Sequence, residues 1–293
     1  MSDKGLAARA GLGWPLAIEV ESYFRFLDVD IRVVSDSVRQ MQYWEAIYSA
    51  FSIHPTEDPQ VVIEAHGDGS AGSLTGVVTT RDGRFPWATR GQLLPPLDLP
   101  LFDRWVHLHG SIVSRGGHGV LVVGTPKTGK TAISLAGVAR GALLVADGIV
   151  PVAVDDLLAH PFPRSLRLRR EELDLLGLNR SHPALRAFRT QDAEVQWRAD
   201  PRALLRTRSA RTATEIAAIA VLPGPDAPPA PEPVLIPMPA YDALAVLIRH
   251  LRTPPARRRR AVDGLVRLAS GVPSYVLHPG TPHATAAVLD GLL

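Results

Sequence analysis

Alternation of hydrophobic and polar residues marks the first ordered part of the chain. Residues 18–36, IEVESYFRFLDVDIRVVSD, alternate as half-buried strands do. Further strands are predicted at 60–66 and 74–80, separated by the turn-rich segment 67–73. A helical pattern lies between the alternating segment 18–36 and the strand at 60–66, with Ser35 or Asp36 as the expected N-cap. Its apolar stripe is expected to be core: Val38, Met41, Trp44, Ile47, Tyr48 and Phe51.

The pattern changes in the middle of the chain to strand, turn, helix and strand. Residues 105–113, WVHLHGSIV, are strand-like, and the glycine turn RGGHG separates them from the apolar strand 119–123. A helix is predicted over 130–141 and a second buried strand over 142–147. Strands that alternate with a helix are typical of a βαβ unit. We therefore expect an α+β region over 1–105, with a role in substrate or partner recognition, and an α/β domain with a mixed sheet over 106–293.

The rest of the chain continues this alternation. A proline-rich stretch, 224–233, is expected to be an irregular surface loop. The remaining predicted elements are a strand at 148–154, a loop and helix at 155–178, a buried strand at 214–222, helices at 239–252 and 283–293, and a strand at 273–280.

Composition narrows the class of protein. The chain has 293 residues, 46% of them hydrophobic, which indicates a packed globular protein. A net charge of only +3, with scattered basic residues, argues against a nucleic-acid partner. The absence of cysteine excludes disulfides, thiolate metal sites and cysteine nucleophiles. No signal peptide or membrane span is recognisable, so we expect a cytoplasmic protein with no membrane partner.

Among the scattered basic residues there is one continuous run. Arg257–Arg260 precedes a helical pattern, and a solvated helix start or loop is its plainest interpretation. An anion or partner site is the alternative.

One segment predicts a phosphate-binding loop. Residues 124–131, GTPKTGKT, fit the pattern G-x-x-x-x-G-K-[ST], with an apolar strand before them and a helix after them. Glycines allow backbone N–H groups to wrap around an anion, and the helix N-terminus favours the same charge. Lys130 is expected to reach the β and γ phosphates, and Thr131 to ligate Mg²⁺. The predicted nucleotide-binding residues are Gly124, Thr125, Pro126, Lys127, Thr128, Gly129, Lys130 and Thr131.

Asp147 ends the next predicted strand. A right-handed crossover would make this strand parallel to, and near, strand 119–123, so Asp147 would reach the phosphate-loop edge of the sheet. A carboxylate there can hold Mg²⁺ together with Thr131, or accept the proton of an incoming hydroxyl. Capping of the following turn is the structural alternative.

Four further polar residues are weaker candidates. Alternation puts His107 and His109 on one face of their strand, where they either border the phosphate site or are satisfied core or surface residues. Arg115 and His118, in the turn that follows, either assist the transferred phosphate or are turn residues.

Taken together, His109-Gly110, the loop GTPKTGKT, Arg140-Gly141 and the strand ALLVAD resemble the bacterial HPr kinase/phosphorylase family. The closer resemblance is to its smaller relatives in biosynthetic clusters, including those of lasso peptides. The spacings from His109 to Gly124 and from Thr131 to Asp147 are those of the family. This resemblance implies a P-loop kinase core, MgATP held by Lys130 and Thr131, Asp147 as the catalytic base, His109 lining the site, and a homo-oligomer.

The sequence also departs from the bifunctional enzymes of that family. Gly148 replaces a second aspartate, Lys127 replaces an internal loop glycine, and the signature EIRGLG is absent. These departures argue against HPr as the substrate and against phosphorylase activity.

The expected function is therefore ATP-dependent phosphate transfer to a hydroxyl, on Ser or Thr of a peptide or protein in a biosynthetic pathway. The alternatives are a kinase of a small hydroxylated molecule, a nucleotide-binding accessory protein without transfer, and a P-loop ATPase. Against the ATPase, strand 214–222 ends without a Walker-B acid, and Asp155 and Asp156 form an adjacent pair of surface type.

Overall fold

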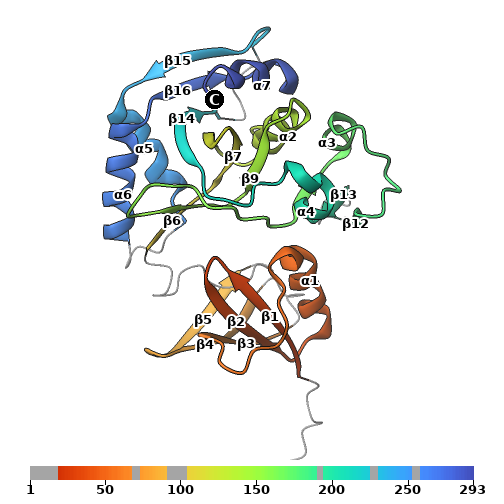
Figure 1. The fold of residues 1–293 in the computed structure, drawn as a ribbon. Helices are drawn as coiled ribbons and strands as arrows, with labels where there is room; N and C mark the ends of the chain where they lie inside the picture. Colours follow the sequence, from red (N-terminus) through yellow and green to blue (C-terminus); the bar gives the residue numbers. More distant parts are fainter. Residues whose placement is uncertain (1–18, 68–72, 91–103, 190–193, 225–229, 253–257) are drawn as a thin grey trace, which may run out of the picture.

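The computed structural model describes residues 19–67, 73–90, 104–189, 194–224, 230–252 and 258–293. An N-terminal unit with one sheet and one long helix lies against a larger α/β core (Figure 1). Within the described residues, no helix has both the length and the apolar character needed to cross a membrane.

The N-terminal unit is a five-stranded sheet in the order β1-β2-β3-β4-β5. Antiparallel pairing joins its strands except at β2 and β3, which run parallel because helix α1 (Val38–Tyr48) connects them. A short 3₁₀ helix, η1 (Ser49–Phe51), follows α1. The strands are β1 (Val20–Phe26), β2 (Val29–Ser35), β3 (Val61–His66), β4 (Ser73–Thr80) and β5 (Gly83–Arg90).

Helix α1 differs from the prediction at its first turn. Its N-cap is Ser37, whose hydroxyl accepts a hydrogen bond from the backbone N–H of Gln40, so the expected cap at Ser35 or Asp36 is wrong. Val38 points outward with 46% of its surface exposed, whereas the other five predicted core residues of this stripe are buried.

The core is built on a six-stranded mixed sheet in the order β15-β16-β14-β8-β7-β9. Strands β14 and β16 run parallel to β8, while β7 is antiparallel to both β8 and β9. Strand β9 is therefore parallel to β8, as predicted, with β7 inserted between them. The strands are β7 (Gly110–Arg115), β8 (His118–Val123), β9 (Leu143–Asp147), β14 (Glu215–Val221), β15 (Val234–Met238) and β16 (Ser274–His278).

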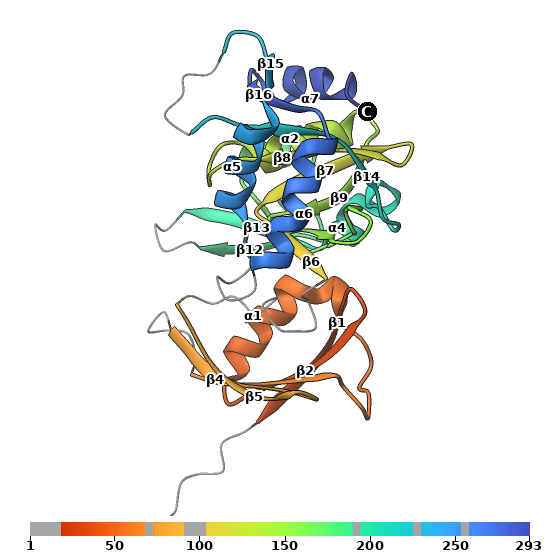
Figure 2. The same ribbon diagram turned by 90° about the vertical axis from the view of Figure 1, so that its left-hand side faces the viewer.

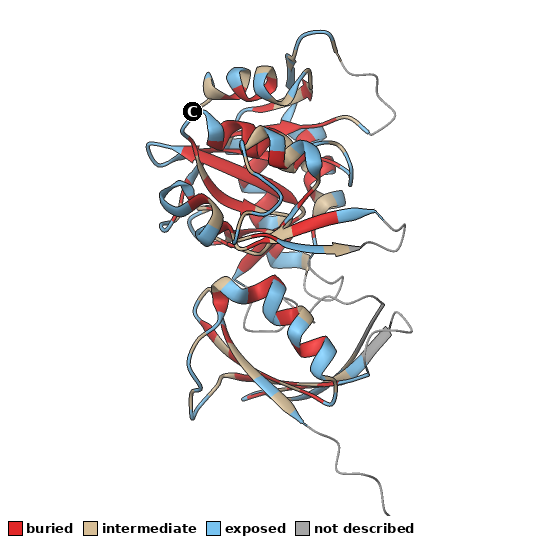
Figure 3. Cartoon of the chain, turned by 90° about the vertical axis from the view of Figure 1, so that its right-hand side faces the viewer, coloured by how far each residue is buried: buried red, intermediate tan, exposed pale blue. Residues whose placement is uncertain are grey.

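Helices cover both faces of this sheet (Figure 2). Val120 and Val122 pack in one cluster with residues of α2 (Lys130–Ala139) and α7 (Pro282–Asp290). Leu121 and Val123 belong to the cluster that includes α5 (Ala240–His250) and α6 (Arg258–Gly271). Strand β8 is buried on both faces as a result, and the sheet forms the buried centre of the core (Figure 3).

Two smaller sheets complete the core. The predicted strand 105–113 is broken at His109, because β6 (Trp105–Leu108) pairs with β10 (Val150–Ala153) and β7 joins the large sheet. The expected loop and helix at 155–178 are present, with α3 as the helix, and the loop before it also contains the short strand β11. The elements here are β11 (Leu166–Leu168), α3 (Arg170–Leu175), β12 (Arg186–Arg189), β13 (Val195–Ala199), α4 (Pro201–Leu205) and η3 (Arg206–Arg208).

An aromatic cluster joins the N-terminal unit to the core. Phe162 of the core is fully buried, with its ring centroid 4.7 Å from that of Phe51 and 6.0 Å from that of Phe26. The backbone N–H of Ser165 donates to the carbonyl of Ile47, at the end of α1. Both units therefore share one continuous hydrophobic cluster.

Candidate nucleotide site

Strand β8 delivers the predicted phosphate loop to the edge of the large sheet. The loop starts at Gly124, where an added β-carbon would lie 2.9 Å from Thr128 Oγ1 and 3.0 Å from the β-carbon of Leu222. It ends at Gly129, whose φ of 89° is in the left-handed region that favours glycine. Helix α2 begins at the next residue, so its N-terminal N–H groups and dipole face the loop.

The middle of the loop is exposed. Thr125, Pro126 and Lys127 are open to solvent, and the Thr128 hydroxyl donates to the carbonyl of Thr125 over 2.9 Å. Lys127 has a φ of 69°, a conformation that glycine adopts without strain. The lysine thus occupies a glycine-like position.

Lys130 is buried at the base of the loop. Its ammonium donates to the carbonyls of Gly124 and Thr125, each over 2.8 Å. Burial lowers the pKa of Lys130, while the negative charge of Asp147 opposes that shift. Two carbonyls of the loop therefore hold the Lys130 ammonium in place.

Asp147 ends β9 beside the first turn of α2. The Thr131 hydroxyl lies 3.0 Å from Oδ2 and 3.2 Å from Oδ1 of this carboxylate. Burial raises the pKa of Asp147, and hydrogen bonds from Thr131 and Ser111, with the charge of Lys130, counteract it. The structure thus brings Asp147, Lys130 and Thr131 together at one edge of the sheet.

His109 lies at the break between β6 and β7. Its Nδ1 is 2.9 Å from the carbonyl of Gly148, which requires that nitrogen to carry the proton and donate. Burial, followed by the charge of Lys130, lowers the pKa of His109 to about 4. A neutral ring then leaves Nε2 as an acceptor, and this buried atom has no partner among the described residues.

Gly148 follows Asp147 with a φ of 81°, in the left-handed region. Its N–H donates to the carbonyl of Gly110, and its own carbonyl accepts from His109. The glycine that replaces the second aspartate of the resembling family therefore fits a backbone conformation that a side chain would strain.

Three basic residues that the sequence reasoning missed also lie at this site. Leu251 bridges Leu108, and the backbone N–H of Arg252 donates to the carbonyl of His107, so the end of α5 runs along β6. This places His250 against His109, with ring centroids 6.2 Å apart, and Arg252 close enough to lower the pKa of Lys130. Arg164 reaches the opposite side, near Asp147 and Gly148.

Other predicted candidates lie elsewhere. Arg115 and His118 are at the far end of the β7–β8 hairpin from the loop, where Arg115 pairs with Asp290 and His118 with Glu215. The suggestion that they assist the transferred phosphate is therefore wrong. His107 is buried in β6 opposite Pro151, and burial lowers its pKa to about 4.

The part of the basic run that the structure describes, Arg258–Arg260, begins α6, in agreement with a helix start. Arg260 pairs with Asp155 over 3.0 Å, while Arg257 lies outside the described residues.

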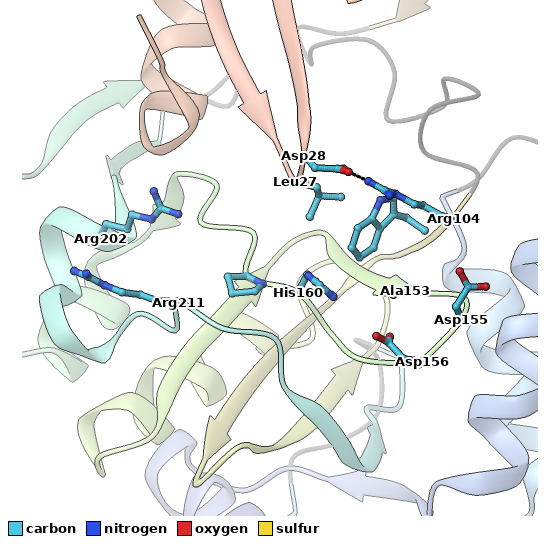
Figure 4. A pocket seen from close by; sticks show the side chains of 11 residues that line it. Leu27, Asp28, Arg104, Ala153, Asp155, Asp156, His160, Arg202 and Arg211 are labelled. Carbon is cyan, nitrogen blue, oxygen red and sulfur yellow. Dashed lines mark ion pairs between the residues drawn. The ribbon is translucent and has the colours of Figure 1, made fainter. Parts of the chain in front are cut away.

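A separate cavity of about 520 Å³ lies between the two units (Figure 4). It is at the Trp105 end of the β6–β10 ribbon, opposite the end that leads to His109. Arg202 and Arg211 lie at one side of it, and Asp155 and Asp156 at the other. Arg104 and Asp28 form an ion pair at its rim.

The arrangement combines a cation-bearing loop, a carboxylate with a raised pKa and a neutral histidine. Hydroxyl and carboxylate oxygens of Thr131 and Asp147 are ligands that Mg²⁺ prefers, and they lie within hydrogen-bonding distance of each other. In the described part of the chain, no cluster of three or more His, Asp or Glu side chains is arranged to hold a metal ion. Any metal here would need oxygens from a ligand as well.

Comparisons with known proteins add little to this geometry. The chain matches no protein-family model, and no curated protein matches it in sequence. Among solved structures, the Hpr(Ser) kinase/phosphatase from Coxiella burnetii is similar at 15% identity and a TM-score of 0.32. The match covers 64% of this chain and 92% of that one, and similarity at this level does not by itself establish a shared function. The chain described here is thus a mixed α/β protein whose sheet edge combines a P-loop sequence with a carboxylate.

Proposed function

We propose that this protein is an ATP-dependent phosphotransferase that moves the γ-phosphate to a hydroxyl group. The observation that supports the proposal most strongly is the contact between Thr131 and Asp147, with Lys130 beside them. That contact joins a phosphate-loop hydroxyl to a carboxylate whose pKa is raised. A carboxylate with a raised pKa is a better proton acceptor than an exposed aspartate.

In the proposed reaction, Asp147 accepts the proton of the acceptor hydroxyl. A bond forms between the acceptor oxygen and the γ-phosphorus, and the bond from that phosphorus to the bridging oxygen breaks. ADP leaves with the electron pair of the broken bond, and Asp147 later releases its proton to solvent. Lys130 and the N–H groups at the start of α2 neutralise charge on the phosphates, so catalysis rests on positioning and electrostatics.

Thr131 would hold Mg²⁺, which when bound neutralises charge on the β and γ phosphates. Asp147 would join Thr131 as a metal ligand in the alternative in which another group accepts the proton. His109 would line the site as a neutral ring and accept a hydrogen bond at Nε2 from the nucleotide or the acceptor. Its low pKa makes it an acceptor at neutral pH.

The acceptor we propose is a serine or threonine of a peptide or protein in a biosynthetic pathway. This part rests on the resemblance of the motifs around His109, the phosphate loop and Asp147 to the small relatives of HPr kinase. A small hydroxylated molecule is the second acceptor class that the same chemistry can use.

The test is transfer of label from γ-labelled ATP, with Mg²⁺, to a peptide library containing serine or threonine at a fixed position. We expect labelling that is lost in Lys130→Ala and reduced about 10²–10⁴-fold in Asp147→Asn. Asp156→Asn is the matched control, because Asp156 lies outside the site and caps Leu158 through an oxygen that asparagine keeps.

Other outcomes would decide against transfer to a hydroxyl acceptor. Binding of ATP without turnover would indicate an accessory nucleotide-binding protein. Release of phosphate at the same rate with and without acceptor would indicate an ATPase.

A further inference from the structure

Arg164 lies near the proposed base, and within the described residues its side chain forms neither a hydrogen bond nor an ion pair. A β-carbon placed on Gly148 would be 3.6 Å from Arg164 Nη1, and the charge of Arg164 lowers the pKa of Asp147. Its Nε is buried and has no hydrogen-bond partner in the part of the chain that the structure describes. A buried donor without a hydrogen-bond partner is destabilising, and an anion bound at this position would supply the missing acceptor.

The backbone around Arg164 is fixed by the core. The N–H of Phe162 donates to the carbonyl of Val145 over 3.0 Å, and Phe162 forms a parallel bridge with Ala146 of β9. The segment therefore runs beside the end of β9, which carries Asp147. Arg164 follows two residues later, where its side chain can reach the same edge of the sheet.

The N-terminal unit fixes the other side of Arg164. The guanidinium carbon lies 6.0 Å from the ring centroid of Tyr48, a buried residue of α1. The next residue, Ser165, donates its N–H to the carbonyl of Ile47 over 2.8 Å. Both contacts come from the last turn of α1, so this helix packs directly against Arg164 and Ser165.

We propose that Arg164 contacts the phosphoryl group during transfer, and that the N-terminal unit holds it in place through Tyr48 and Ile47. This inference rests on the proposed function and assigns a role to the N-terminal unit. A guanidinium presents a rigid fork of donors that matches phosphate oxygens. Within the described residues Arg164 Nε has no hydrogen-bond partner, so this donor can bind a phosphate oxygen.

With Arg164 included, basic side chains lie on two sides of the site. Lys130 and Arg252 lie on the loop side, where their charges act on each other and on His109. Arg164 lies on the carboxylate side, where the acceptor and the γ-phosphate would meet. Negative charge that develops on the phosphoryl group in the transition state would thus be stabilised by basic side chains from both sides.

The test compares binding of MgADP alone with binding of MgADP plus fluoroaluminate, which mimics the transferred phosphoryl group. We expect Arg164→Gln to keep the MgADP affinity within about threefold and to weaken the fluoroaluminate complex by about 100-fold. Arg164→Lys should give an intermediate loss, because lysine supplies charge without the fork of donors.

Variants of α1 test the role of the N-terminal unit. Tyr48→Leu removes the ring face and should weaken fluoroaluminate binding by about tenfold, whereas Tyr48→Phe keeps the ring and should bind as the wild type does. Arg202→Gln is the matched interface control, because Arg202 donates to the carbonyl of Ala50 over 2.9 Å without contacting Arg164. Thermal unfolding of each variant checks that it is folded.

Three results would overturn the inference. Unchanged fluoroaluminate binding in Arg164→Gln would show that this residue does not contact the phosphoryl group. An unchanged complex together with a shifted acid limb of the pH profile would show that Arg164 acts only on Asp147. Equal losses of fluoroaluminate affinity in Tyr48→Leu and Arg202→Gln would show that Tyr48 of α1 has no specific role in holding Arg164. Absence of MgADP binding in the folded wild type would instead contradict the proposed function itself.

Discussion

Two hydroxyl groups lower the pKa of Asp147, against the effect of burial, which raises it. Its pKa is raised by burial, and hydrogen bonds from Thr131 and Ser111 lower it. Because the proposed base must be deprotonated, activity should fall as pH drops through this raised pKa. At high pH, activity should fall again as Lys130, whose pKa is lowered, loses its proton.

We therefore predict that Ser111→Ala moves the acid limb of kcat/KM to higher pH. The change removes the Ser111 hydroxyl, which lowers the pKa of Asp147 and also hydrogen-bonds to Ser134 Oγ and the carbonyl of Ala146. The measurement is the pH profile of label transfer. Ser114→Ala, a buried serine further along β7, is the control and should leave that limb in place. An acid limb that does not move in Ser111→Ala would exclude Asp147 as the group that titrates.

Gly148 gives a second prediction. An aspartate at this position would adopt a φ near 81° and should lower the free energy of unfolding by about 1–2 kcal/mol. Its carboxylate would also lie next to Arg164, so we expect transfer activity to fall rather than rise in Gly148→Asp. Denaturant unfolding and label transfer measure the two effects.

The control for that variant is Gly116→Asp. Gly116 also has a positive φ, of 61°, with open space around it, but lies at the far end of the β7–β8 hairpin. It should lose similar stability and keep its activity. Higher activity in Gly148→Asp would mean that this site accepts a second acidic residue.

The site residues fall into two groups by how they could be found. Lys130, Thr131 and Asp147 lie within one strand–helix–strand segment, so local spacing was sufficient to place them near each other. Arg164 and Arg252 reach the site through contacts between distant segments, such as the bridge between Ala146 and Phe162. No local pattern encodes such contacts, and the segments that carry these two residues, within 155–178 and 239–252, predict only a loop and a helix.

Helix α1 depends on its N-cap. The Ser37 hydroxyl satisfies the N–H of Gln40, and a helix of 11 residues has few other means to satisfy its first turn. We predict that Ser37→Ala lowers the free energy of unfolding by about 1 kcal/mol, measured by denaturant titration. Ser37→Thr should keep most of the stability, and an equal loss in both variants would contradict the capping role.

Strands with strong alternation or continuous burial were predicted correctly, and weak ones were missed. Strand β5 contains Pro86, and β12 and β15 carry exposed or charged residues, so none has a clear pattern of its own. Each is stabilised by pairing with a neighbour, as β15 is by β16. Such strands depend on tertiary context more than on intrinsic preference.

The contact between the two units is concentrated on Phe162. Its ring is fully buried and meets both Phe26 and Phe51. We predict that Phe162→Ala lowers the free energy of unfolding by about 3–5 kcal/mol and separates the unfolding of the N-terminal unit from that of the core. Calorimetry should show one transition in the wild type and two in the variant.

A single transition with an unchanged midpoint in Phe162→Ala would contradict this coupling. The interface could not be predicted from the sequence, because the aromatic residues that form it come from β1, η1 and a loop after β10. Each of them also fits the core of its own unit.

Nucleotide binding underlies every functional statement made for this molecule. Titration calorimetry of MgATP should give a Kd between about 1 μM and 1 mM for the wild type. Lys130→Ala should weaken that binding at least tenfold, as expected for the loss of a charge-assisted hydrogen bond worth about 1.5–3 kcal/mol. Asp156→Asn should bind as the wild type does. No binding by the folded wild type, or equal binding by Lys130→Ala, would contradict a phosphate-binding role for residues 124–131.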